Sequence, residues 1–194
     1  IDSTMVYTYA QAVGAVQDTT WVCQMGRNFG RQLQAMGIHM NFAPDADINT
    51  NPNNPVINFR SFGEDKKNVA EKTWLVAKGM QDIGVIPVAK HFPGHGDTQT
   101  DSHKTLPLVD YPKPRLDSVE TYPFRYLTEK GISAIMSAHL NVPALDNSGT
   151  PSSLSKRIIT GYLKNEIGFK GFIVTDAINM KGVRTQAGNT EVEA

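Results

Sequence analysis

Residues 90–103 read KHFPGHGDTQTDSH and contain three of the five histidines of the chain. Two carboxylates, Asp97 and Asp101, lie among these histidines. The preceding residues 85–88 form a short apolar run, which is typical of a buried strand. The polar cluster therefore follows the end of a strand, where α/β proteins collect their functional groups. A single histidine is more often a structural residue, but a cluster of titratable side chains at one strand end indicates a site.

Length and composition exclude several classes of protein. The 194 residues can form one domain with a full core. Lys plus Arg and Asp plus Glu number 19 each, so neither nucleic acid nor an anionic membrane surface is expected as a partner. The single cysteine, Cys23, excludes a disulfide framework and a cysteine-based zinc site. No run of eighteen apolar residues is present, so no membrane span is expected.

Helix and strand patterns alternate along the chain. Helices are predicted over residues 21–36, 65–83, 118–130 and 156–167, and a helix within residues 1–18 also fits the composition. Short apolar runs predict strands over residues 38–43, 85–89, 132–138 and 171–174. This alternation predicts a parallel sheet with helical crossovers.

Two details of this pattern lead to specific expectations. In the first long helix, expected to be capped by Thr19 or Thr20, five apolar residues at helical spacing predict a stripe that faces the core. These residues are Trp21, Met25, Phe29, Leu33 and Met36. The long Asn- and Pro-rich loop over residues 48–58 indicates a functional segment. Arg60 follows it between two phenylalanines, either as an ordinary surface charge or as a fork for a polar substrate.

Every predicted strand delivers polar residues to its carboxyl end. These residues are Asp47, Lys90 with His91, His139, and Asp176. Their convergence is typical of a (β/α)8 barrel or a doubly wound sheet. The segment Gly94-His95-Gly96 lacks the third glycine of a phosphate fingerprint and opens no helix, so no dinucleotide cofactor is expected. We predict a TIM-barrel-like α/β fold, and an incomplete one, because a complete barrel takes about 250 residues.

Three side chains indicate a chemistry. Asp176, after the last predicted strand, is either a helix cap or a carboxylate presented as nucleophile or base. Asp101 and His103 point the same way in an extended stretch, so Asp101 can hold the imidazole and raise its basicity. A carboxylate nucleophile with a separate proton donor is the formula for glycoside hydrolysis with retention, although the usual donor is a second carboxyl group.

Several segments together resemble glycoside hydrolase family 3. KHFPGHGD at 90–97, DSH at 101–103 and LP at 106–107 are similar to the signature of its β-N-acetylglucosaminidase branch, whose bacterial members trim peptidoglycan fragments. Further similar motifs follow the family's order: NFAP at 41–44, RSFG at 60–63, MSAH at 136–139 and VTD at 174–176. The resemblance spans roughly residues 38–183.

The resemblance implies a catalytic role for three residues. Asp176 matches the nucleophile that forms the covalent glycosyl-enzyme. His103 matches the acid and then the base, and Asp101 is its partner in the dyad. An Asp–His dyad in place of a Glu implies an N-acetylglucosaminide as substrate rather than a glucoside. Whether water or phosphate is the acceptor stays open.

The resemblance also implies a substrate-binding set. Arg60, Lys90 and His91 match residues that hold the sugar hydroxyls, and Asp47 matches a supporting acidic position. His95 is expected to brace the loop rather than to touch sugar. A carbohydrate is therefore the expected partner, with neither a metal nor another cofactor, in the bacterial cytoplasm or cell envelope.

The chain departs from the family pattern in one respect. The Asp-x-Glu-Gly-Gly segment of an early strand is not present, and neither is the last barrel strand. Residues 1–194 are therefore expected to form part of a single catalytic barrel domain cut from something longer. Whether this piece is active alone, and whether another domain follows Ala194, stay open.

Two other functions compete with the glycosidase. His91, His95, Asp97, Asp101 and His103 are a possible ligand set of a metal-dependent hydrolase, although residues 92–94 prevent a helical His pair. The second alternative is a non-catalytic carbohydrate-binding remnant. The joint presence of the three candidate catalytic residues argues against this remnant.

Overall fold

The computed structural model describes residues 4–98, 106–180 and 183 of the chain. Its elements follow in the order α1 (Ala10–Gly14), α2 (Thr19–Ala35), β1 (Met40–Asn41), η1 (Asn58–Arg60), α3 (Lys66–Asp82), β2 (Ile86–Phe92), α4 (Lys113–Ser118), α5 (Tyr122–Lys130), β3 (Ala134–Ser137), η2 (Arg157–Glu166) and β4 (Phe172–Thr175). The strands form one sheet in the order β1-β2-β3-β4, and every neighbouring pair is parallel. The predicted alternation and the parallel sheet are therefore confirmed.

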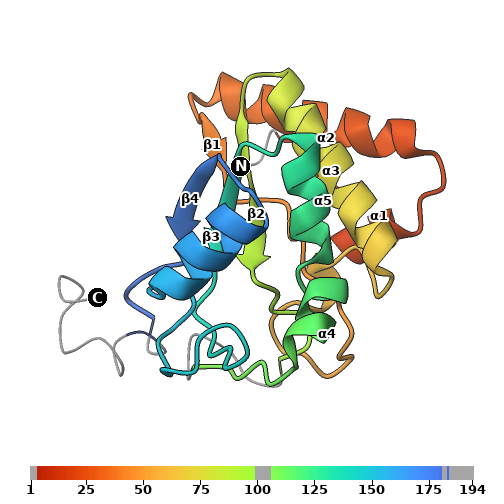
Figure 1. Cartoon of the computed structure of the whole chain (residues 1–194). Coiled ribbons are helices and arrows are strands. Elements are labelled where there is room, and N and C mark those ends of the chain that lie inside the picture. The colour runs from red at the N-terminus through yellow and green to blue at the C-terminus, as the bar shows by residue number, and fades with distance from the viewer. Residues whose placement is uncertain (1–3, 99–105, 181–182, 184–194) are drawn as a thin grey trace.

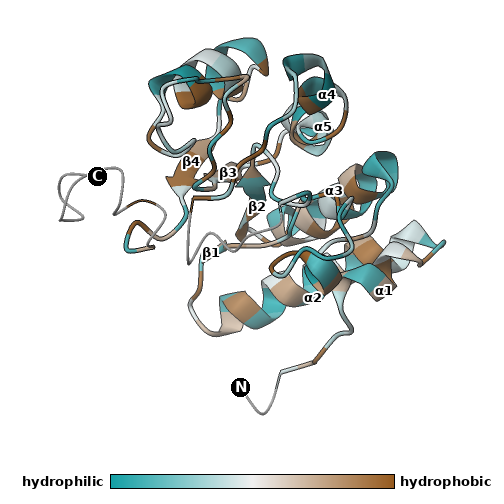
Figure 2. Cartoon of the chain, turned by 90° about the horizontal axis from the view of Figure 1, so that it is seen from below, coloured by the Kyte–Doolittle hydropathy of each residue, from teal (hydrophilic) through white to brown (hydrophobic). Residues whose placement is uncertain are grey.

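The helices gather on one side of this sheet, as Figures 1 and 2 show. One buried cluster lies between the sheet and the helices that cover it, and it includes Phe92, Phe124, Ile135 and Leu163. A second cluster, which includes Val22, Val69 and Met80, joins α2 to α3. A curved sheet with helices on its outer side is the layout of a (β/α)8 barrel.

The central strand β2 is longer than predicted. It continues through Lys90 and His91 to Phe92, whereas the polar side chains were expected to follow the strand. The main chain remains paired on both sides: Ala46 N donates to Lys90 O at 2.5 Å, and Ala138 N donates to Phe92 O at 2.8 Å. The prediction ended the strand at its first polar residue, but polar side chains at the mouth of a barrel still belong to strands. The other strands lie within the predicted ranges or one residue beyond them.

The predicted core stripe of α2 is wrong at both ends. Trp21 is 68% exposed and Met36 is 38% exposed. The side of α2 that faces α3 is formed instead by small residues, among them Gly26 and Gly30. A Cβ atom on Gly26 would lie 2.3 Å from the carbonyl oxygen of Val76 in α3, so only glycine allows the two helices to lie this close.

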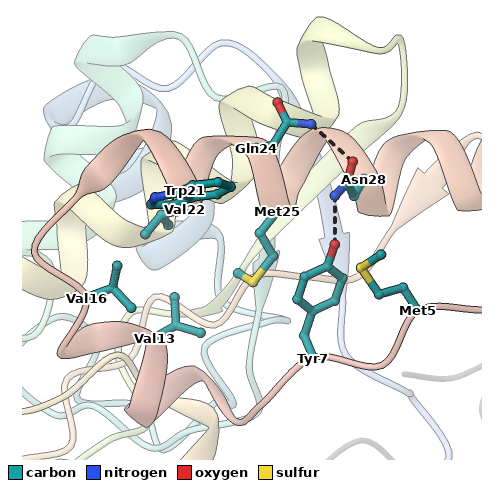
Figure 3. A pocket seen from close by; sticks show the side chains of 9 residues that line it. All are labelled: Met5, Tyr7, Val13, Val16, Trp21, Val22, Gln24, Met25 and Asn28. Atoms are coloured by element: carbon teal, nitrogen blue, oxygen red, sulfur yellow. Dashed lines mark hydrogen bonds between the residues drawn. The ribbon is translucent and has the colours of Figure 1, made fainter.

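The middle of the stripe is confirmed, because Met25, Phe29 and Leu33 pack against the second cluster. Trp21 and Met25 also line a surface pocket of about 390 Å³. Figure 3 shows Trp21 and Met25 on α2 above the N-terminal segment that carries Met5 and Tyr7. Asn28 of α2 donates a hydrogen bond of 2.8 Å to the Tyr7 hydroxyl and so fastens this segment to the helix. The middle of the stripe is thus partly covered, while Trp21 remains open to solvent.

Side chains cap the start of three helices. Asp65 caps α3 by accepting from Asn68 N at 2.8 Å. Ser155 accepts from Ile158 N at 3.1 Å at the start of η2. The cap of α2 is Asp18, which accepts from Thr20 N, rather than either threonine.

The helix predicted over residues 118–130 begins later, as α5 (Tyr122–Lys130), and the separate short helix α4 (Lys113–Ser118) precedes it. Pro123 lies in the first turn of α5, where its missing N–H is not needed. The hydroxyl and the amide of Thr121 both donate to Leu116 O at 2.9 Å and close the end of α4. Gly131 ends α5 in the left-handed conformation.

The last helix, η2, has the wider π-type hydrogen bonding, for example from Ile167 N to Tyr162 O at 2.9 Å. Its buried residues are Ile158, Tyr162 and Leu163. Within residues 4–98, 106–180 and 183, the helices are too short or too polar to cross a membrane.

Candidate functional site

Three charged groups meet where β1 and β2 end. Asp45, which follows β1 after Phe42, Ala43 and Pro44 and bridges to Lys90 of β2, is 7% exposed. Its Oδ2 lies 2.9 Å from Nε of Arg60, and its Oδ1 lies 3.6 Å from Nζ of Lys90. Burial raises the pKa of Asp45 above its usual value, and the nearby positive groups oppose that rise. Asp45 thus holds a guanidinium group and an ammonium group side by side at the carboxyl end of the sheet.

Asp47 forms a second anchor from the same segment. It is fully buried and accepts from the amide and from Nδ1 of His91, at 3.1 and 2.7 Å, and from the amide of His95 at 2.7 Å. Burial alone would raise the pKa of Asp47, but His91 and these hydrogen bonds hold it below its usual value. The ring of His91 is therefore fixed with Nδ1 turned inward and Nε2 turned toward Arg60, 3.4 Å away.

Sequence reasoning singled out Asp47 but missed Asp45. Both residues lie in one extended stretch at positions i and i+2, so they point the same way. This spacing was the signal that could have identified Asp45.

Arg60 is placed by these contacts rather than by its aromatic neighbours. Besides Asp45, it donates from Nη1 to Val56 O at 3.2 Å. Phe62 is buried in the core, while Phe59 packs on Tyr9 with ring centroids 5.5 Å apart. Arg60 is therefore an ordered side chain at the end of η1 and not an unpaired surface charge.

Asp176 follows β4 at the same end of the sheet. Its amide donates to Ser137 O at 2.9 Å, and its Oδ1 accepts from Ala177 N at 2.8 Å. Residues 177–180 form a turn, so in the part of the chain that the structure describes Asp176 caps no helix. The partly buried carboxylate lies at the strand end where a barrel presents its reacting groups.

The two other candidate catalytic residues, Asp101 and His103, lie outside the described residues. The segment before them is braced as expected for His95. Nδ1 of His95 lies 2.7 Å from the Thr98 hydroxyl, and Asn54 donates to the His95 carbonyl at 2.8 Å. Burial lowers the pKa of His95 below its usual value, against the opposing attraction of Asp47.

The structure gives a different set of possible metal ligands from the one that the sequence suggested. Among the residues described, the donor atoms of Asp45, Asp47 and His91 lie within 4.8 Å of one another. Asp97 of the suggested set instead accepts from the Tyr111 hydroxyl at 2.6 Å. The carboxylates of the observed group already pair with Arg60, Lys90 and His91. The cations Arg60 and Lys90 thus balance the charge of Asp45, and Asp47 is occupied by hydrogen bonds from His91 and His95, which does not favour a metal-dependent hydrolase.

The arrangement defines a class of protein. A parallel sheet covered by helices on one side, with polar groups at the carboxyl ends of its strands, is a TIM-barrel-like α/β domain with its site at the barrel mouth. Residues 2–194 match the family described as "Glycosyl hydrolase family 3 N terminal domain", and the chain belongs to this family.

Named relatives agree with this assignment. Beta-hexosaminidase A of Pseudoalteromonas piscicida is 38% identical over 191 residues, which cover 91% of this chain and 32% of that protein. The structure of a family 3 beta-N-acetylglucosaminidase from Paenibacillus sp. str. FPU-7 superposes with a TM-score of 0.94 at 41% identity, covering 98% of this chain and 37% of that one. The structure of NagZ from Neisseria gonorrhoeae in complex with N-trifluoroacetyl-D-glucosamine gives a TM-score of 0.86 at 32% identity, over 94% of this chain and 55% of that one.

These relatives confirm the resemblance to family 3 and to its β-N-acetylglucosaminidase branch. The chain spans about a third of the length of the first two proteins, in agreement with an incomplete barrel. The family match also confirms the TIM-barrel-like fold class.

Proposed function

We propose that the protein carrying this chain is a β-N-acetylglucosaminidase, which removes terminal β-linked N-acetylglucosamine from peptidoglycan fragments or related glycans. The named relatives support this activity, and one of them holds an N-acylated glucosamine in its structure. We further propose that residues 1–194 form part of a single catalytic barrel domain. The continuous family match over residues 2–194 supports this division.

The observation that carries the proposal is the convergence of Arg60, Lys90 and His91 at one strand end, held by Asp45 and Asp47. Guanidinium and ammonium groups donate several hydrogen bonds, and the imidazole of His91, fixed by Asp47, adds a ring nitrogen of fixed direction. Such a set suits a ring of sugar hydroxyls. Because both carboxylates are buried, the donors are ordered before the substrate arrives. This arrangement supports a substrate-binding role for Arg60, Lys90, His91 and Asp47.

The proposed reaction proceeds in two displacements. In the first, the Asp176 carboxylate attacks the anomeric carbon while His103, assisted by Asp101, protonates the departing glycosidic oxygen. This step breaks the glycosidic C–O bond and leaves a glycosyl-aspartate ester. In the second, His103 takes a proton from water, the water oxygen attacks the same carbon, and the bond to Asp176 breaks. Two inversions at one carbon give net retention.

The test is hydrolysis of an aryl N-acetyl-β-glucosaminide beside the matching aryl β-glucoside, in the complete protein that carries this chain. We expect turnover of the N-acetyl substrate and a loss of kcat of at least about 10³-fold in Asp176→Ala. Asp82→Ala is the matched control, because Asp82 is an exposed carboxylate at the far end of α3, paired with Arg27 and Lys78. It should retain the full rate.

Other results would contradict the proposal. Turnover of neither substrate would exclude a β-N-acetylglucosaminidase, and full activity in Asp176→Ala would remove the proposed nucleophile. Release of an N-acetylglucosamine disaccharide unit from a peptidoglycan fragment, without further trimming of the terminal residue, would contradict the terminal specificity.

A further inference from the structure

His139 has no role in the proposed function, although it lies in the middle of the site's strand ends. It follows β3 by two residues and is fully buried. Its Nδ1 lies 2.6 Å from the hydroxyl of Ser153, and its Nε2 lies 3.1 Å from the carbonyl oxygen of Ala177. The ring thus joins the loop before η2 to the residue that directly follows Asp176.

These two contacts fix the orientation of the ring. A backbone carbonyl can only accept, so Nε2 carries a hydrogen and donates it to Ala177. In the neutral imidazole Nδ1 is then the acceptor, and the Ser153 hydroxyl donates to it. Ser153 therefore selects the tautomer that can reach Ala177.

The backbone around Asp176 is held from two sides. The Asp176 amide donates to Ser137 O in β3, and the Ala177 carbonyl accepts from His139. The Ala177 amide lies between these two anchors and donates to Oδ1 of Asp176 at 2.8 Å. A change in the Ala177 contact would rotate this amide and with it the carboxylate that the amide binds.

We propose that His139 is a positioning residue for the nucleophile: through Ala177 it sets the direction of the Asp176 carboxylate. This inference depends on the proposed role of Asp176. A buried histidine often only connects two segments by hydrogen bonds. The test must therefore separate a changed orientation of the Asp176 carboxylate from a loss of protein stability. Misplacing a reacting group by about 1 Å can cost about 10²-fold in rate.

The experiment compares two replacements of His139 in the complete protein. The amide nitrogen of Gln can reach the position of Nε2, whereas that of Asn reaches only the position of Nδ1. We expect His139→Asn to lower kcat on the aryl N-acetyl-β-glucosaminide by about 10²-fold with little change in KM. The kcat of His139→Gln should be about tenfold higher than that of His139→Asn. Ser153→Ala should lower kcat a few-fold.

Ser155→Ala is the control for stability in the same loop. The Ser155 hydroxyl binds Asp146 and caps η2 without contacting His139. This variant should lower the melting temperature and keep kcat. Each kcat is divided by the fraction of enzyme that a mechanism-based inhibitor titrates, so that unfolded protein does not count.

The outcomes separate the two proposals. If wild type is active, Asp176→Ala is inactive and both His139 variants keep the wild-type kcat per titrated site, only the role of His139 is overturned. The positioning role is also overturned if the Asn and Gln variants lose kcat equally, in proportion to the decrease in their melting temperatures. His139 would then have a structural role only. If wild type turns over neither substrate, the proposed function fails, and the role of His139 fails with it.

Discussion

At the scale of single residues, the carboxylate of Asp47 accepts three N–H hydrogen bonds and has no contact with solvent. In Asp47→Asn an amide group would replace one acceptor oxygen, so a buried N–H donor would face another donor. We expect the free energy of unfolding to fall by about 3 kcal/mol, measured by urea denaturation. Asp82→Asn, which alters an exposed ion pair, should cost less than about 1 kcal/mol. Equal costs would contradict this account of Asp47.

His95 gives stability a dependence on pH. Because burial lowers its pKa, the folded chain binds a proton at His95 less readily than the unfolded chain, whose histidines titrate near about 6.5. The contribution is therefore complete above that value and is lost as the pH falls below it. We expect stability to decrease from pH 7.5 to pH 5.5, and His95→Gln to flatten this slope by up to about 1.4 kcal/mol per pH unit.

The measurement is the urea midpoint at several pH values. The matched control is His39→Gln, because His39 is exposed on the surface. This control should leave the slope unchanged. A His95→Gln variant with the slope of wild type would show that another group causes the dependence.

Residue types could be predicted from the sequence, but their contacts could not. Asp47, His91 and Asp176 were singled out because carboxylates and histidines at strand ends are uncommon unless they act. The contact between Arg60 and His91 joins residues 31 positions apart, and no local spacing encodes it. Asp45 was missed although it lies two residues before Asp47, because its contacts with Arg60 and Lys90 join separate segments of the chain.

At the scale of elements, α2 and α3 pack through glycine. We expect Gly26→Ala to lower the free energy of unfolding by about 2 kcal/mol, because the added methyl group would meet the Val76 carbonyl and force the helices apart. Gly161→Ala in η2 is the control, because nothing lies within 4 Å of its added Cβ. It should be neutral or stabilise the protein by up to about 1 kcal/mol. A stable Gly26→Ala protein would contradict the close packing.

The exposure of Trp21 leads to a second prediction for α2. A core tryptophan replaced by alanine costs about 3–5 kcal/mol, whereas an exposed one costs less than about 1 kcal/mol. We expect the smaller cost for Trp21→Ala, because Trp21 is 68% exposed. Trp74→Ala is the comparison, since Trp74 packs against the main core cluster, and it should cost clearly more. The measurement is chemical denaturation of both variants, and equal costs would contradict the exposed position of Trp21.

The type of each element was predictable from the sequence. Which side of a helix is buried was predictable only in some cases. The buried side of α3 carries apolar residues at helical spacing, among them Val69, Val76 and Met80. In α2 the same spacing rule is confirmed only for Met25, Phe29 and Leu33, which pack against the second cluster. The closest contact with α3 is made by glycines, which an apolar pattern does not mark. The apolar periodicity of a helix shows where its large apolar residues lie. It does not show where the backbone itself forms the packing surface.

At the scale of the whole molecule, β1 and β4 each pair with one neighbour within the described residues. In a closed barrel every strand has two neighbours. We expect residues 1–194, produced alone, to turn over the N-acetyl substrate at least about 100-fold more slowly than the complete protein. We also expect this piece to self-associate through its strand edges, as sedimentation would show. A monomeric piece with the kcat of the complete protein would contradict both expectations.

The hydrogen bonds of Asp47 have a consequence for motion. They enclose the amide hydrogens of His91 and His95, which belong to a strand and to the loop that follows it. Exchange of these hydrogens with solvent requires the segment after β1 to separate from β2, so they should exchange with deuterium as slowly as the core of the sheet. The conformational entropy of this half of the site is then lost once, during folding, and not again each time a ligand binds.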